Sequence, residues 1–337
     1  MAHSSPISAY ADAQSLLVRL EERRRLSPVR FPLRTRMRIA ERQALARLDN
    51  LPLHDDDLLI DGRGSVQTSG FDLSHGRHAI GSAIELDAIL NDSMVLLQWL
   101  GAIADPAITA SSTWQRAVPD MLDTVAGWQQ DIATLPPSPP LLHGAQMARL
   151  WRERAPAGRG DLVYSLLIGD RWGPGCWDGS AGGLIALGLE RNALPWKNAR
   201  GEQLESIWLD AVGTGAQMHL DLEVRLRAYA ARAAQFINSR KRPGRLKDVL
   251  SLAMSRPRIS SKDVAKALNL TVAGAIKLLS IATDAGLLIE RTGQASYRSY
   301  AIPVTAPSEA GSRMRPDPFP TSPARLDWSD DDELGFI

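Results

Sequence analysis

The strongest constraint on the fold is a set of helix start and stop signals near the C-terminal end of the chain. Ser260 is followed three residues later by Asp263, the spacing of a capping box that begins a helix. Asn269 stands where a short turn needs a residue tolerant of left-handed backbone geometry, and Thr271 is suited to cap a second helix. Gly286 then ends that helix. The sequence predicts two helices joined by a short turn.

The second of these helices has an apolar face, and the first carries a small residue where the second crosses it. We expect Ala265 at the crossing. On the buried side of the second helix we expect Ala275, either Leu278 or Leu279, and Ala282. The next stretch, LLIERTGQASYRSYAI, alternates on both sides of TGQA, which is a hairpin signal. Helix, turn, helix and hairpin is the order of a winged helix-turn-helix, whose second helix enters the major groove of DNA.

We therefore expect DNA contacts from both helices and from the wing. The expected contact residues are Thr271, Ala273, Gly274 and Lys277 on the second helix, Lys262 on the first, and Arg291, Gln294 and Arg298 on the wing. Thr271 and Ala273 lie at the end of the helix that faces base edges, whereas Lys277 and the wing arginines are suited to contact phosphate or the groove. The first turns of the second helix hold no Arg, Asn or Gln, so specificity is modest or lies in the wing.

Charge is concentrated in the same part of the chain. Residues 238–300 contain twelve Lys or Arg against four Asp or Glu, a net charge of +8 within a chain of net charge +1. Such a local excess suits neutralisation of phosphate, so duplex DNA is the expected partner. The alternative is a winged helix used for protein interaction or dimerisation, with solvated basic residues and a second copy of the chain as partner.

The rest of the sequence predicts a mainly α-helical protein. With 337 residues, 44% of them hydrophobic and 23% charged, the chain is long enough for two or three domains. The one cysteine, Cys176, excludes an intramolecular disulfide. No signal-peptide pattern and no apolar run of about 20 residues stand in the sequence, so we expect a cytoplasmic protein without a membrane span.

Helical spacing of apolar residues recurs along the chain. Helices are predicted at 12–48 with a break near Pro28 and Pro32, at 77–103 as one long helix or two, and at 141–154, 161–169, 182–192, 201–212 and 216–239. Loop or short strands are expected at 51–76, and a rigid linker at 135–140, LPPSPP. The charged, proline-interrupted stretch 238–248 predicts a domain boundary.

The C-terminal half resembles the end of Fic-family proteins, in which a helical catalytic core precedes a winged helix with a TGR…R-x-Y wing. Here the wing is RTGQASYRSYAI. Upstream, GSAIELDAIL at 81–90 is similar to the Fic motif that ends Ile-Glu-Gly, whose glutamate, here Glu85, obstructs nucleotide binding in that family. The loop GPGCWDGSAGG at 173–183 falls where the catalytic signature His-Pro-Phe-x-Asp-Gly-Asn-Gly-Arg belongs.

This resemblance implies a degenerate nucleotide loop. Alignment on the shared Asp-Gly pairs the end of the signature with Asp178, Gly179, Ser180, Ala181 and Gly182. Pro174 then occupies the position of the catalytic histidine and Gly182 that of the arginine. Proline cannot act as a general base, and glycine gives an anion no charged partner. The chain is therefore not expected to be an enzyme. The alternative is a diverged Fic-like nucleotidyltransferase that uses the winged helix for docking or dimerisation.

The whole chain also resembles a family of uncharacterised proteins, often carried on plasmids of rhizobia and their relatives. In these proteins a domain of unknown function precedes a helix-turn-helix DNA-binding domain, which implies a role in transcription or another DNA transaction on a plasmid. The expected division is an N-terminal helical and irregular region (1–69), a helical, degenerate Fic-like domain (70–240), a winged helix-turn-helix domain (241–303) and an acidic, disordered tail (304–337).

No cofactor or metal is expected. Two histidines three residues apart, His75 and His78, would share a face on a helix and could bind a metal, but no third ligand stands at a recognisable spacing, which favours a polar loop. The tail ends in LDWSDDDELGFI, which is either a solubilising segment or one that docks a partner or folds back on the basic domain. Most of the nine tryptophans are expected to be core residues.

Overall fold

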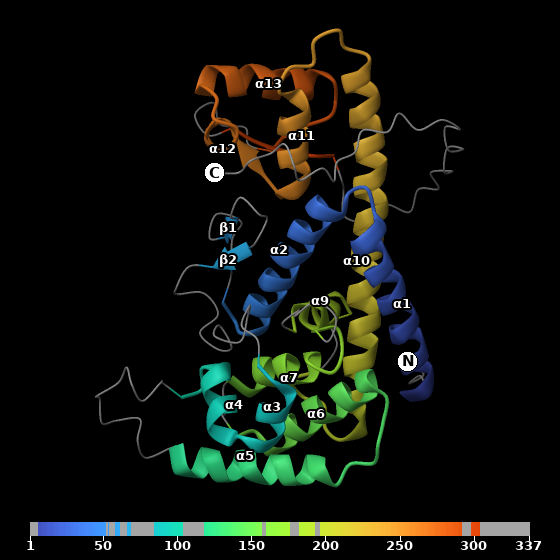
Figure 1. Ribbon diagram of the computed structural model, residues 1–337, viewed down its shortest axis with the longest axis vertical. Helices are drawn as coiled ribbons and strands as arrows, with labels where there is room; N and C mark the ends of the chain where they lie inside the picture. The colour runs from blue at the N-terminus through green and yellow to red at the C-terminus, as the bar shows by residue number, and fades with distance from the viewer. Residues whose placement is uncertain are drawn as a thin grey trace. The chain divides into compact units, whose positions relative to one another are not determined.

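The computed structural model describes residues 6–51, 53, 58–60, 66–68, 84–103, 118–156, 160–175, 182–192, 196–291 and 298–303 (Figure 1). This part of the chain is mainly helical, as predicted. The chain divides into two compact units. The first consists of residues 1–21, 38–58 and 68–218, and the second of residues 22–37, 59–67 and 219–337.

The N-terminal helices confirm the predicted break at the prolines. Helix α1 spans Pro6–Leu26 and α2 spans Arg30–Leu48, so Pro28 lies between them and Pro32 lies in the first turn of α2, where a missing N–H costs no helical hydrogen bond. Two short strands follow, β1 (Leu58–Ile60) and β2 (Val66–Thr68), which pair with each other.

The first unit also contains a run of helices from α3 to α9. These are α3 (Leu86–Asn91), α4 (Ser93–Leu100), α5 (Val118–Ala133), α6 (Pro140–Arg154), α7 (Asp161–Asp170) and α9 (Gly183–Arg191). Two short helices therefore lie in the described part of 77–103, and α5 lies where no helix is predicted. Residues 136–139 have no regular structure, which agrees with the predicted linker.

Tryptophans form the centre of this unit. Trp128, Trp151, Trp196 and Trp208 are almost completely buried, which confirms the expectation for these four. The rings of Trp128 in α5 and Trp151 in α6 meet edge-on at 5.1 Å. The Trp151 indole N–H donates to the buried Asp161 carboxylate at 2.7 Å, which connects α6 to the start of α7.

Helix α10 spans Glu202–Asn238 without interruption, so the predicted break between 212 and 216 is wrong. Gly213 and Gly215 suggest a break, because glycine weakens a helix in isolation. In the structure Gly215 lies against α9, where an added Cβ would stand 2.3 Å from the carbonyl oxygen of Leu184. Close packing of two helices, and not a turn, accounts for this glycine.

The second unit contains the C-terminal helices and a three-stranded sheet. After α10 come α11 (Leu246–Ser255), β3 (Ile259–Ser260), α12 (Ser261–Ala267), α13 (Val272–Asp284), β4 (Ile289–Glu290) and β5 (Ser299–Ala301). The strands are antiparallel in the order β3-β5-β4. The predicted hinge at 238–248 therefore ends inside the first turn of α11.

Buried polar contacts hold the second unit together. The Ser27 hydroxyl donates to the Glu223 carboxylate at 2.7 Å, and both side chains are buried. The Arg36 guanidinium donates to the carbonyl oxygens of Met254 at 2.8 Å and Ala253 at 3.0 Å. These carbonyls belong to the last turn of α11, so Arg36 satisfies acceptors that the helix leaves open and connects α2 to α11.

Within the described residues, no single helix is long and apolar enough to cross a membrane. Helices α12 and α13 reach the required length and apolarity only when taken together, and the chain bends by 114° between them.

Candidate nucleic-acid interface

Local hydrogen bonds fix the start of both predicted helices. The Ser260 hydroxyl accepts from the Asp263 backbone N–H at 3.2 Å, and the Asp263 carboxylate accepts from the Ser260 N–H at 2.8 Å, which completes the capping box. Asn269 has a φ of 50°, and the Thr271 hydroxyl accepts from the Gly274 N–H at 3.1 Å. Each of these predictions is confirmed.

Helix α13 has one buried and one exposed face. Ala275, Leu279 and Ala282 are buried, whereas Leu278 is only partly covered, which decides between the two leucines. Beside this buried face, Val272 and Ile276 are 48% and 51% exposed. This apolar pair at i,i+4 spacing is not among the predicted contact residues. No sequence signal distinguishes this pair, because Val272 and Ile276 lie three residues from the buried Ala275 and Leu279 and continue the apolar side of the helix. Only packing shows that they are exposed.

The predicted hairpin is present in its described part. Strands β4 and β5 pair with Ile289 opposite Ala301 and Glu290 opposite Tyr300, and the Arg291 N–H donates to the Ser299 carbonyl at 2.8 Å. The turn itself, with Gln294, lies outside the described residues. Strand β3 is a third strand that was not predicted, because two residues are too few to show alternation.

The exposed lysines of α12 and α13 have no acidic partner among the described residues. Lys262 and Lys266 lie one turn apart on α12, and Lys277 lies on α13. All three are exposed, and none makes a salt bridge with a described side chain. Their charge is therefore available to an external anion.

The other predicted contact residues differ in their surroundings. Thr271 and Ala273 are exposed, whereas Gly274 is half-buried and serves the cap through its N–H. Arg291 and Arg298 are exposed, and the Arg298 guanidinium lies 3.5 Å from the Glu290 carboxylate. Part of the Arg298 charge is thus already compensated on the hairpin.

The second unit is strongly basic beyond these helices. Residues 22–37 and 219–303 together contain 21 Lys or Arg and seven Asp or Glu, a net charge of +14. Arg23, Arg25 and Arg34 contribute exposed charge from the N-terminal helices. Arg256 is more covered, and burial lowers the pKa of its guanidinium while the charge of Asp263 opposes that shift.

The predicted nucleotide loop lies mostly outside the described residues. Asp178, Gly179 and Ser180 belong to that part of the chain, and so does Cys176. At the edge of the loop, Gly182 caps α9 with a φ of +72°, and an added Cβ would lie 3.0 Å from the backbone of Leu166. Backbone conformation and space therefore both favour glycine at this position. Glu85 is exposed and precedes α3 without a side-chain capping bond.

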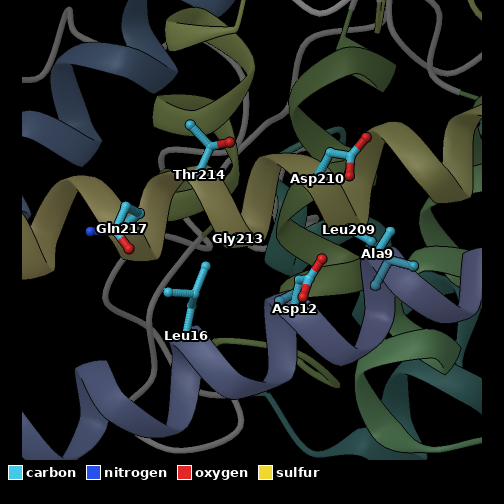
Figure 2. A pocket seen from close by; sticks show the side chains of 9 residues that line it. Ala9, Asp12, Leu16, Leu209, Asp210, Gly213, Thr214 and Gln217 are labelled. Atoms are coloured by element: carbon cyan, nitrogen blue, oxygen red, sulfur yellow. The ribbon is translucent and has the colours of Figure 1, made fainter. Parts of the chain in front are cut away.

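A small pocket lies between α1 and α10 in the first unit (Figure 2). Its volume is about 220 Å³, and the carboxylates of Asp12 and Asp210 stand at one end of it, with Thr214 and Gln217 further along α10. Among the described side chains, no group of three His, Cys, Asp or Glu is arranged to hold a metal ion.

No protein-family model matches the sequence, and no curated protein matches it significantly.

Proposed function

We propose that the chain binds duplex DNA through α12 and α13 and acts as a transcriptional regulator or in another plasmid DNA transaction. The observation that carries this proposal is the exposed N-terminal half of α13, which Thr271 caps, together with three exposed lysines on α12 and α13 that have no acidic partner in the part of the chain that the structure describes.

The arrangement of the elements supports a winged helix-turn-helix. The chain bends by 114° between α12 and α13, within the range of helix-turn-helix pairs. The antiparallel strands β4 and β5 follow directly, where a wing belongs. In such a unit the second helix lies in the major groove with its N-terminal residues toward the bases, while the wing contacts the backbone.

Charge supports the same partner. A net charge of +14 over 22–37 and 219–303 is much larger than the +1 of the chain, so positive charge is concentrated in the unit that holds α12 and α13. Each lysine that contacts a phosphate releases condensed counterions, which favours binding and makes it depend on salt.

Replacement of Lys262 and Lys277 by alanine tests the proposal. We expect the double variant to bind a 30-base-pair duplex more weakly than the unmodified chain. The slope of log K against log salt should fall by about 0.9 for each phosphate contact that is lost. Fluorescence anisotropy over a series of salt concentrations measures both quantities.

The matched control removes two exposed charges from the first unit, through Arg191→Ala and Lys197→Ala. This variant has the same net charge as the test variant, but the two replaced residues lie outside α12 and α13. It should therefore keep the affinity and slope of the unmodified chain. Equal slopes for all three proteins would overturn the assignment of DNA contacts to α12 and α13.

A further inference from the structure

The exposed surface of α13 is unusual for a helix that contacts base edges. In its first two turns it presents Val272, Ala273 and Ile276, all apolar, together with Lys277. Val272 and Ile276 expose about half of their side chains, although burial of such side chains is favourable. This pair lies in the first two turns of α13, the part of the second helix that a helix-turn-helix presents to the bases.

These turns have few polar side chains, and the Thr271 hydroxyl is already engaged in capping the helix. The Thr271 hydroxyl accepts the Gly274 N–H as the helix cap, and Gly274 has no side chain. No amide or guanidinium side chain lies between Thr271 and Lys277. Apart from Lys277, these turns therefore lack the side chains that form paired hydrogen bonds to guanine or adenine.

One feature of the major groove matches an apolar side chain, namely the 5-methyl group of thymine. On the basis of the DNA binding proposed above, we propose that Val272, Ala273 and Ile276 recognise DNA through thymine methyl groups. Adenine–thymine pairs are then distinguished by apolar contact and not by hydrogen bonds to the base edge.

Charge complementarity selects DNA as the partner of this apolar surface. Lys277 lies on the same helix, and Lys262 and Lys266 lie on the helix before it, so positive charge accompanies the apolar pair. A second copy of the chain would bring the same charges toward each other. A stable dimer also buries about 800 Å² on each partner, far more than two half-exposed side chains supply.

Deoxyuridine provides the test, because it differs from thymidine only by the methyl group. The full chain first selects 30-base-pair duplexes from a random pool, and every thymine in a selected duplex is then replaced by uracil. We expect the affinity of the unmodified chain to fall by about four-fold for each contacted methyl, the effect of leaving one methyl group in water.

The double variant Val272→Ala, Ile276→Ala should bind the thymine duplex more weakly and should discriminate less between thymine and uracil. Ser280→Ala, an exposed change further along α13, should discriminate as the unmodified chain does. Circular dichroism of each variant verifies that the helices are retained.

The outcomes separate this inference from the proposed function. Binding to duplex DNA without discrimination between thymine and uracil would overturn the inference and leave DNA binding intact. Absence of binding to any duplex in the pool would overturn both. If the unmodified chain sediments as a dimer and the double variant as a monomer, with uracil tolerated, the apolar pair belongs to a contact between copies and the inference fails.

Discussion

At the scale of single residues, short-range hydrogen bonds define the turn between α12 and α13. The Ser260 and Asp263 pair starts α12, and Thr271 starts α13 through the Gly274 N–H. Asn269 takes the left-handed conformation between them, with a φ of 50°. These contacts span no more than three residues, so local chemistry sets where each helix begins.

Loss of the capping hydroxyl should destabilise this region. Ser260→Ala removes the acceptor of the Asp263 N–H and leaves that donor at the start of α12 without its partner. We expect the free energy of unfolding to fall by about 1 kcal/mol, the usual cost of losing such a cap. Urea denaturation measures the change.

Ser280→Ala serves as the control for this change, because Ser280 is exposed in the middle of α13. It should alter stability by less than about 0.5 kcal/mol. Equal effects of the two substitutions would contradict a special role for the Ser260 cap.

Local signals of this kind could be predicted from the sequence because the partners lie three or four residues apart. Contacts between residues that are distant in the sequence could not be predicted in this way. Arg36 donates to Met254, 218 positions later, and nothing near Arg36 in the sequence indicates that partner. The choice between Leu278 and Leu279 likewise depends on which elements pack against α13.

At the scale of elements, the main difference from the prediction is the continuity of α10. Gly213 and Gly215 predict a break, but the helix passes through both. The two glycines have different surroundings: a Cβ added at Gly213 would lie 3.6 Å from its nearest neighbour, the Cα of Ala13, whereas one at Gly215 would lie 2.3 Å from the Leu184 oxygen.

Alanine substitutions should separate these two roles. Gly213→Ala meets ordinary contact distances and should stabilise the protein by up to about 1 kcal/mol through helix propensity. Gly215→Ala forces α9 and α10 apart and should cost about 3 kcal/mol, the upper end of typical overpacking. Thermal denaturation of both variants tests this, and a stable Gly215→Ala protein would contradict the close approach of α9.

Helices could be predicted where apolar residues recur at helical spacing and where residues that start or stop a helix stand at the ends. These include α6, α7, α9, α12 and α13. Strand β3 could not, because its two residues pair with β5 some forty positions later and show no alternation of their own. Of the candidate site, the capped turn and the lysines could be predicted. The exposed Val272 and Ile276 could not, since only packing shows which face of α13 is covered.

At the scale of the whole molecule, the basic compact unit is assembled from segments that lie far apart in the sequence. Residues 22–37 belong to the same compact unit as 219–303, although more than 180 residues separate them in the sequence. The arginines of 22–37 therefore add to the charge of that unit, in which residues 22–37 and 219–303 together have a net charge of +14. The domain boundary predicted between 240 and 241 stays a prediction.

The central claim is that duplex DNA contacts the exposed surface of α12 and α13. Ultraviolet cross-linking of the full chain to a 30-base-pair duplex, followed by mass spectrometry of the cross-linked peptides, tests it most directly. We predict cross-links in peptides from residues 262–291, and their loss in the Lys262→Ala, Lys277→Ala variant. Cross-links confined to the first unit, for example to α5 and α6, would contradict the account.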